Sequence, residues 1–399
     1  MLRRWQQANE KALLVEIKAA LAFGLLTLAF SPQPSASAPD STKHQTRLDT
    51  THCSFYCVRF ILYLAQAKLE KSGGSYLRAQ IREVMRGPMN DATSRKAAKP
   101  VPGEDSVHSS VPLTSVYKVK ADGIGVFYRA AGATNAPVVL LLHGFPTSSF
   151  MFRELIPRLA SDYRVIAPDL PGFGFTEVPS GRNYVYSFDQ LALTVEAFTR
   201  ALQIDRYALY VFDYGAPTGF RLAMAHPDRV TAIVSQNGNA YEEGLGEAWG
   251  PIRKYWNAPT AENRDILRQS ILTAGGTRWQ YTHGVPNPES VPPESYTLDT
   301  ALLERPGNKE IQLDLFLDYA TNVKLYPKFQ EYFRKSKPPL LAVWGQKDPF
   351  FVPAGAEAFR KDLPNAKVQF LDTGHFAIET HVVEIASAMK EFLDNAPRR

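Results

Sequence analysis

Short apolar runs recur along the chain after residue 115, and segments with helical spacing separate them. Continuous apolar runs bounded by turn residues favour strands that are buried on both faces of a parallel sheet. We expect such strands at residues 137–142, 163–167, 207–212, 232–235, 340–344 and 368–371. Helical spacing is found at residues 151–159, 188–202, 217–225, 354–363 and 382–393.

An antiparallel hairpin precedes these runs. Residues 116–120 and 124–129 alternate in polarity and are joined by an Asp-Gly turn. Because strands and helices then take turns, the predicted fold class is α/β, with a doubly wound, mostly parallel, eight-stranded sheet. Residues 241–335 break this alternation with helical segments and Pro-rich joints, which predicts a helical insertion between core segments 111–240 and 336–399.

Residues 1–110 form a leader of a different character. They carry a net charge of +6, whereas the rest of the chain has −1, so the basic pI gives no reason to expect a nucleic-acid partner. Arg3 and Arg4, an apolar stretch at 19–30 and small residues to 38 are typical of a secretory signal. The charged Glu10 and Glu16 argue against export, so the compartment stays open between export and the cytoplasm.

The leader holds two further features. Its apolar stretch is shorter than the roughly 20 residues that a membrane span needs, and residues 72–110 have the composition of a disordered linker. Both cysteines, Cys53 and Cys57, lie in the leader without a companion pair, so we expect no metal site.

Polar side chains follow three of the predicted strands. Asp213 comes directly after the strand at 207–212, Asp348 follows the strand at 340–344, and His375 follows the strand at 368–371. Ligands in open α/β sheets bind outside the carboxyl ends of the strands. We therefore expect these three side chains to converge.

This set of residue types predicts covalent catalysis. The Asp213 carboxylate would attack an electrophilic carbon and form an alkyl ester, which divides one difficult displacement into two easier steps. His375 would act as general base on water, and Asp348 would orient the imidazole and stabilise its cation. Gly215 and Gly219 are the small residues that a strained strand-to-helix turn requires. The alternative for Asp213 is a helix N-cap.

A second loop would complete the site. His143-Gly-Phe-Pro146 follows the strand at 137–142, and the backbone N–H groups of Phe145 and Tyr214 are expected to form an oxyanion hole. For His143 we favour a buried histidine that supports the loop. The Gly-rich residues 169–176 lack a phosphate-binding Lys, so they are interpreted as a turn beside the site rather than a nucleotide loop.

Over residues 116–393 the chain resembles the epoxide hydrolase and haloalkane dehalogenase branch of the α/β-hydrolase superfamily. The motifs that carry the resemblance are His143-Gly-Phe-Pro146, the Asp213 turn, Gly345-x-x-Asp348-Pro349 and Gly374-His375. The resemblance implies an α/β-hydrolase fold in which residues 241–335 form a helical cap.

The resemblance also implies cap tyrosines that donate protons to an epoxide oxygen. Tyr319, in the sequence Asp318-Tyr-Ala-Thr-Asn322, looks like one such donor, although it could instead be a core aromatic. Tyr255 is the candidate for the second donor.

Halide chemistry is the competing reading. Haloalkane dehalogenases hold the halide with indole N–H groups, one from a Trp after the nucleophile, where this chain has Tyr214. Trp249, Trp256 and Trp279 could contribute instead. Fluoroacetate dehalogenases have Arg at that position, and epoxide hydrolases usually have Trp there and Gly where this chain has Val211, so no subfamily matches cleanly.

We therefore expect an epoxide hydrolase that converts an epoxide and water to a diol. The alternatives are a haloalkane or haloacid dehalogenase, a hydrolase of another activated carbon or acyl compound, and a non-catalytic ligand receptor. The aromatic residues Phe145, Phe150, Tyr214 and Trp249 predict a small apolar substrate. The chemistry requires no metal or organic cofactor, and a monomer or homodimer is expected.

Overall fold

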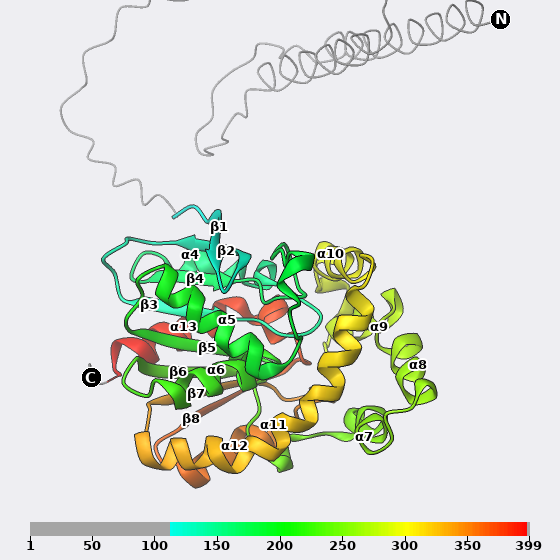
Figure 1. Ribbon diagram of the computed structural model, residues 1–399. Coiled ribbons are helices and arrows are strands. Elements are labelled where there is room, and N and C mark those ends of the chain that lie inside the picture. The colour runs from blue at the N-terminus through cyan, green and yellow to red at the C-terminus, as the bar shows by residue number, and fades with distance from the viewer. Residues whose placement is uncertain (1–111, 397–399) are drawn as a thin grey trace, which may run out of the picture. The chain divides into compact units, whose positions relative to one another are not determined.

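The computed structural model describes residues 112–396, so the predicted leader and its two cysteines lie outside the described residues. An eight-stranded sheet forms the centre of the described part (Figure 1). Its strand order is β1-β2-β4-β3-β5-β6-β7-β8; the pairs β1–β2 and β2–β4 are antiparallel and all other pairs are parallel. This sheet confirms the predicted fold class.

The strands lie close to the predicted runs, because each run combines apolar residues with turn residues at its ends. The hairpin turn has positive φ at Asp122 and Gly123, as the tight turn between two twisted strands requires. The strands are β1 (Ser115–Ala121), β2 (Ile124–Ala131), β3 (Val138–Leu142), β4 (Arg164–Pro168), β5 (Tyr207–Phe212), β6 (Val230–Gln236), β7 (Leu340–Gly345) and β8 (Lys367–Leu371).

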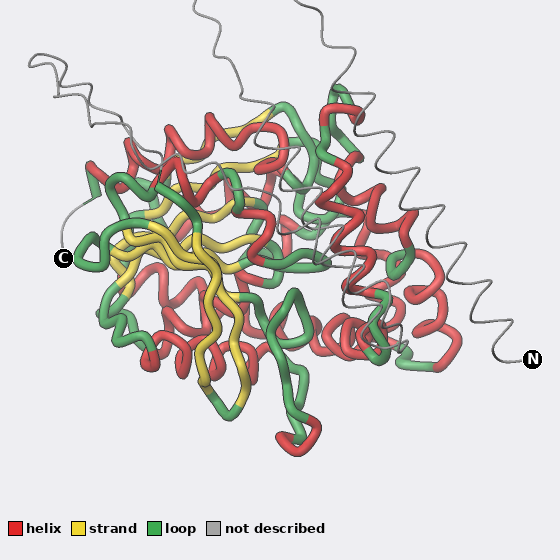
Figure 2. Tube along the Cα trace, turned by 90° about the horizontal axis from the view of Figure 1, so that it is seen from above, coloured by secondary structure: helices red, strands yellow, loops and turns green. Residues whose placement is uncertain are grey.

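Helices cover both faces of the sheet, as Figure 2 shows. Alternate residues of one strand enter different cores: Leu140 and Leu142 pack on one face of β3, and Val139 and Leu141 on the other. The first face is covered by α5 (Phe188–Ala201), α6 (Gly215–Ala225) and α12 (Pro353–Asp362), and the second by α4 (Leu155–Leu159) and α13 (Ala377–Asp394).

Two helices differ from the prediction. The expected helix at 151–159 is divided into a 3₁₀ turn, Ser149–Phe152, and the short α4, because the Ser148 hydroxyl caps the turn by accepting from the N–H of Phe150. The last helix begins at Ala377 rather than at residue 382, with non-helical backbone angles at His381. The kink explains why helical spacing is clear only after it.

A helical insertion lies between β6 and β7. It runs from Tyr241 to Ser336, contains no strand, and packs beside one end of the sheet in Figure 1. Its longest helix, α11, packs against α5, α6 and α12 of the core. The helices are α7 (Gly250–Asn257), α8 (Ala261–Ser270), α9 (Ala274–Thr282), α10 (Pro293–Leu303) and α11 (Asn308–Ser336).

Residues 112–396 lack two features that would change the function classes to consider. None of the helices there has the length and apolar character needed to cross a membrane. That part of the chain also contains no cluster of three or more His, Cys, Asp or Glu side chains suited to a metal ion.

Candidate active site

The carboxyl ends of β3 and β5 carry the two loops that build the site. These strands are parallel neighbours, but the helix that follows β3 packs on one face of the sheet and the helix that follows β5 on the other. Such a reversal opens a crevice at the strand ends, where α/β proteins bind their ligands.

Asp213 stands on a strained turn between β5 and α6. Its φ of 48° is in the left-handed region, which a non-glycine residue adopts only when its surroundings impose it. The turn also requires glycine beside it, because a Cβ on Gly215 would lie 2.2 Å from the carbonyl oxygen of Leu142. The turn therefore holds the Asp213 side chain at the carboxyl edge of the sheet.

The carboxylate of Asp213 turns toward the neighbouring loop instead of capping α6, whose N-terminus has no side-chain cap. Its Oδ1 accepts a 2.6 Å hydrogen bond from the N–H of Phe145, and the N–H of Tyr214 also donates to the carboxylate. These are the two donors expected of an oxyanion hole. Burial raises the pKa of Asp213 to about 6, although His375 and the two N–H groups oppose the rise.

His375 approaches the same carboxylate from the end of β8. Its Nε2 lies 4.0 Å from Oδ2 of Asp213, and its Nδ1 donates to Oδ2 of Asp348 over 2.7 Å. Burial acts to lower the pKa of His375, but pairing with Asp348 and the nearness of Asp213 raise it above its ordinary value. The structure thus brings Asp213, Asp348 and His375 together.

Asp348 is itself held by groups that the sequence analysis did not select. Its Oδ2 accepts from Nδ2 of Asn237 over 2.8 Å, and its Oδ1 accepts from the N–H of Phe350 over 2.8 Å. Asn237 also accepts from the N–H of Gly345 and has a positive φ of 49°. The sequence feature that could have indicated Asn237 is the Asn-Gly pair directly after β6. This pair lies at the same edge of the sheet as the other three strand ends.

A small cavity of about 20 Å³ is lined in part by Asp213. This volume holds roughly one water molecule. Core and insertion residues line it together: Phe145, Asp213, Tyr214, Trp249, Ile252, Ile271, Gln280, Phe316, Phe350 and His375. A larger groove of about 740 Å³ near Pro137 and Arg206 contains none of the triad, so we assign the site to the small cavity.

Tyr319 is buried in α11 beside the cavity, although it is not one of the lining residues. Its ring lies 5.7 Å from that of Tyr214 and 4.5 Å from that of Trp249. Within the described chain its hydroxyl makes no hydrogen bond of normal geometry. Burial raises the pKa of Tyr319 well above its usual value, with further contributions from Tyr326 and Asp213, so the phenol stays protonated.

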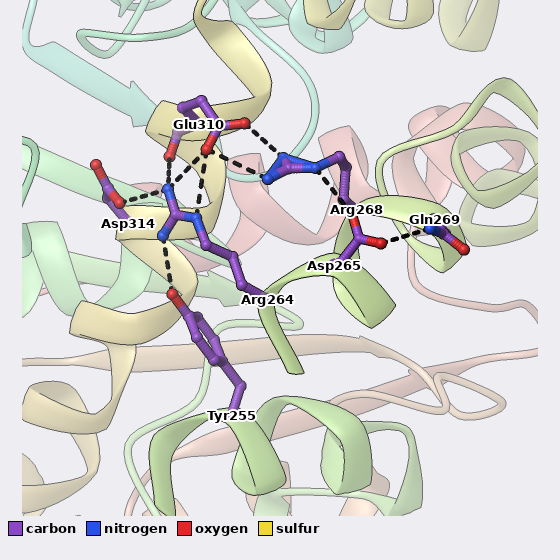
Figure 3. A network of polar contacts seen from close by, with 7 residues as sticks. All are labelled: Tyr255, Arg264, Asp265, Arg268, Gln269, Glu310 and Asp314. Carbon is purple, nitrogen blue, oxygen red and sulfur yellow. Dashed lines mark hydrogen bonds and ion pairs between the residues drawn. The ribbon is translucent and has the colours of Figure 1, made fainter. Parts of the chain in front are cut away.

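Tyr255 occupies a different position from the one expected. Its hydroxyl accepts a 2.8 Å hydrogen bond from Arg264, which also pairs with Glu310 and Asp314 (Figure 3). This network joins α7, α8 and α11 inside the insertion. The hydroxyl is thereby tied to the Arg264 guanidinium, and Tyr255 does not line the cavity.

The aromatic residues predicted to line the substrate pocket differ in whether they reach the cavity. Trp249 lines the cavity with its ring, but its indole N–H donates to the carbonyl of Phe350 over 3.0 Å. Trp256 likewise donates to the carbonyl of Phe316. Phe150 departs from the expectation: its ring lies 4.6 Å from the guanidinium of Arg153 and does not line the cavity.

The loops around the site have supporting roles. His143 is fully buried; its Nδ1 contacts the carbonyl of Gly144, and its Nε2 accepts from the N–H of Leu170. This is the supporting histidine that we favoured from the sequence. The Asp169 carboxylate accepts from the N–H groups of Ser149 and Phe175, so residues 169–176 form a turn braced beside the site.

Comparison with known proteins places this geometry among hydrolases. A family model described as alpha/beta hydrolase fold matches residues 137–382. An uncharacterized hydrolase of Saccharomyces cerevisiae is 54% identical over 270 residues, covering 66% of this chain and 92% of its own length. Epoxide hydrolase 3 of Xenopus tropicalis is 30% identical over 195 residues, 48% of this chain and 50% of its length. The solved haloalkane dehalogenase DbeA of Bradyrhizobium elkani superimposes with a TM-score of 0.59 at 24% identity, covering 70% of this chain and 98% of its own.

Proposed function

Since the chain belongs to the alpha/beta hydrolase fold family, in the branch of epoxide hydrolases and haloalkane dehalogenases, and is a hydrolase, we propose that it opens epoxides to diols through an ester on Asp213. Residues 241–335 act as the cap over this site. The single observation that carries the proposal is the asymmetric environment of the Asp213 carboxylate.

That asymmetry assigns the two carboxylate oxygens different tasks. Oδ1 is held by the N–H of Phe145, whereas Oδ2 faces His375 across 4.0 Å. The free oxygen can attack carbon, and the held oxygen becomes the carbonyl oxygen of the ester. When water later adds to that ester, negative charge develops on the oxygen already bound by the N–H groups, which is where such donors accelerate the reaction.

The two steps proceed as follows. Oδ2 of Asp213 forms a bond to an epoxide carbon as the carbon–oxygen bond of the ring breaks, and a phenol, Tyr319 in the first instance, protonates the released oxygen. Water then attacks Cγ of Asp213 while His375 accepts its proton, with Asp348 stabilising the imidazolium. Collapse of the tetrahedral intermediate releases the diol, which takes its proton from His375, and the regenerated carboxyl group returns a proton to the phenolate.

The donors around the cavity favour epoxide chemistry over halide chemistry. Indole N–H groups are the halide donors that the resemblance to haloalkane dehalogenases implies, but the indoles of Trp249 and Trp256 already donate to backbone carbonyls. Trp279 is 43% exposed. Buried phenols beside the carboxylate, by contrast, suit an oxygen that must acquire a proton.

The small cavity volume limits the substrate. Room for one water molecule beside Asp213 means that a substrate enters only when insertion side chains such as Ile252 and Phe316 move aside. The lining is predominantly apolar, so a small apolar epoxide fits it best.

The first experiment compares two substrate classes. The purified protein is incubated with styrene oxide and with a 1-bromoalkane, and diol and bromide release are followed together. We expect diol without bromide, and none from Asp213→Asn. Bromide without diol would make the enzyme a dehalogenase.

A second experiment tests the covalent intermediate. With enzyme in excess over styrene oxide in ¹⁸O-labelled water, the first diol should carry no label, because its new oxygen comes from Asp213. His375→Gln should stop after the first step, and intact mass spectrometry should find one equivalent of substrate on Asp213. Label in the first diol would show direct attack by water and refute the ester.

A further inference from the structure

Tyr214, the residue after the proposed nucleophile, carries a buried hydroxyl without a hydrogen-bond partner within residues 112–396. The side chain is 1% exposed and lines the small cavity beside Asp213. A buried donor that lacks a partner costs free energy, because it has lost its bonds to water. Such a group in a cavity wall is explained when a ligand supplies the missing partner.

Aromatic rings enclose the Tyr214 ring, and none of them accepts a hydrogen bond from its hydroxyl. The nearest is Phe188 at 4.9 Å, followed by Tyr319, Phe145, Phe173 and Phe316, all within 6.2 Å between centroids. The carboxylates whose charge acts on its hydroxyl are those of Asp213 and Asp318. In these surroundings burial raises the pKa of Tyr214 well above its usual value, so it holds its proton.

Tyr214 and Tyr319 share these properties. Both hydroxyls are buried, both are affected by the Asp213 charge, and their rings lie 5.7 Å apart. The hydroxyl of Tyr319 interacts with that of Tyr326, whereas that of Tyr214 has no partner in the described chain. Tyr255 is also buried, but its hydroxyl accepts from Arg264 and its side chain does not line the cavity. The two phenols on which the Asp213 charge acts therefore come from one tyrosine of the core and one of the insertion.

We propose that the phenol of Tyr214 is a catalytic residue that donates a hydrogen bond to the epoxide oxygen during ring opening, together with Tyr319, and that it fills the role expected of Tyr255. This inference rests on the proposed epoxide hydrolysis. As the ring carbon bonds to Oδ2 of Asp213, the released oxygen takes a proton from one phenol and is hydrogen-bonded by the other. The carboxyl group regenerated by ester hydrolysis restores that proton, so no other reactant is needed.

The position of Tyr214 has a mechanical consequence. Because it directly follows Asp213 on the strained turn, nucleophile and donor are fixed relative to each other and do not depend on how the insertion closes. A three-membered ring, in which the attacked carbon and the departing oxygen are adjacent, suits a donor and a nucleophile that are close together. Tyr319 belongs to the insertion, so it would reach the epoxide oxygen only when the insertion packs over Asp213 and Tyr214.

The test measures ester formation in single turnovers, by rapid quench and mass spectrometry with styrene oxide. Tyr214→Phe keeps the ring and the backbone N–H but removes the hydroxyl. A positioned proton donor contributes roughly a hundredfold or more to the rate, and we expect a loss of roughly that size. The variant should melt at the wild-type temperature or above it, since the hydroxyl satisfies no bond in the fold.

Tyr207→Phe is the matched control. Tyr207 lies on the same strand, β5, and its hydroxyl is also buried and unpartnered in the described chain, but it is at the opposite end of the strand from Asp213. Its rate should equal that of the wild type. A wild-type rate for Tyr214→Phe, or a large loss for Tyr255→Phe alone, would overturn the proposal. Failure of the wild type to form any diol would instead refute the epoxide hydrolase assignment.

Discussion

The imidazole of His375 and the carboxylate of Asp213 face each other at 4.0 Å, a distance longer than a hydrogen bond. His375 is instead bonded to Asp348 at 2.7 Å. In the proposed mechanism, the nucleophile is therefore free of the base. This separation suits the proposed two-step reaction, in which His375 acts only after the ester has formed.

The ionisation of Asp213 should set the lower pH limit of ester formation. Burial raises its pKa to about 6, and only the carboxylate can attack. Below pH 6 the rate of ester formation should fall about tenfold per pH unit, and above pH 7 it should be constant. Rapid-quench measurements with the wild type from pH 4.5 to 8 check this. A rate that is flat across that range would show that Asp213 is not the titrating nucleophile.

Burial of the ionised Asp213 carboxylate should also lower the stability of the folded protein. The folded pKa of Asp213 is raised above that of the unfolded chain, so the folded state holds a proton that the unfolded state has lost between about pH 4 and 6. The wild type should lose stability as pH rises through this window. Asp213→Asn cannot ionise and should be more stable above pH 6, by about 1–3 kcal/mol. Chemical denaturation at pH 5 and pH 8 measures the difference. Equal stabilities at pH 8 would contradict the burial argument.

Gly144 should tolerate no side chain. A Cβ at this position would lie 2.2 Å from Oδ1 of Asp213 and 2.5 Å from the backbone nitrogen of Tyr214, so it would displace the bond from Phe145. Gly144→Ala should lower the rate of ester hydrolysis by roughly a hundredfold or more, as loss of an oxyanion-hole donor does. Gly250→Ala is the control, since its Cβ would meet no atom within 4 Å. Comparable activity of the two variants would show that the close approach is not needed.

The sequence predicted those parts of the molecule that local patterns determine. Each strand of the sheet is a compact apolar run with turn residues at its ends, and Asp213, Asp348 and His375 follow such runs directly. Their convergence follows from parallel strands sharing one edge. Fold class and triad geometry could therefore be inferred without coordinates.

Side-chain direction on helices could not be inferred in the same way. Tyr255 and Tyr319 both lie on amphipathic segments of the insertion, but which hydroxyl faces the site depends on partners far away in the chain. Arg264 donates to the hydroxyl of Tyr255, whereas the hydroxyl of Tyr319 interacts with that of Tyr326. Phe150 was misplaced for the same reason, because its ring packs with Arg153.

Asn322 should position Tyr319. One turn after that tyrosine, its buried Oδ1 accepts a 2.6 Å hydrogen bond from Arg221, which attaches α11 to α6. Asn322→Ala leaves a buried guanidinium N–H without its acceptor and should destabilise the protein by about 1–3 kcal/mol. If Asn322 positions Tyr319, ester formation should also slow several-fold with little change in KM. Thr321→Ala, whose contact with Arg221 is 3.4 Å, is the control. A stability loss without any rate loss would leave Asn322 purely structural.

Asp299 should make stability depend on pH at the junction between insertion and core. This carboxyl in α10 is fully buried, and burial raises its pKa to about 8. The neighbouring groups that act on it are Tyr281 of α9, Thr147 after β3, Asp169 after β4 and Glu379 of α13. The hydroxyl of Tyr281 donates to its Oδ2, while Oδ1 has no partner within residues 112–396. Asp299 is therefore expected to be protonated in the folded protein at neutral pH.

The proton on the buried Asp299 carboxyl group determines whether stability rises or falls with pH. Between about pH 4 and 8 the folded state retains it and the unfolded state has released it, so the wild type should lose stability as pH rises. Asp299→Asn keeps an uncharged side chain at every pH, and its advantage over the wild type should grow through this window by about 1.4 kcal/mol per pH unit and then level off at about 5 kcal/mol. Urea denaturation at pH 5, 7 and 9 measures the difference, with the exposed Asp228→Asn as the control for loss of one charge. An advantage that is the same at all three pH values would mean that Asp299 is already ionised inside the fold at pH 5.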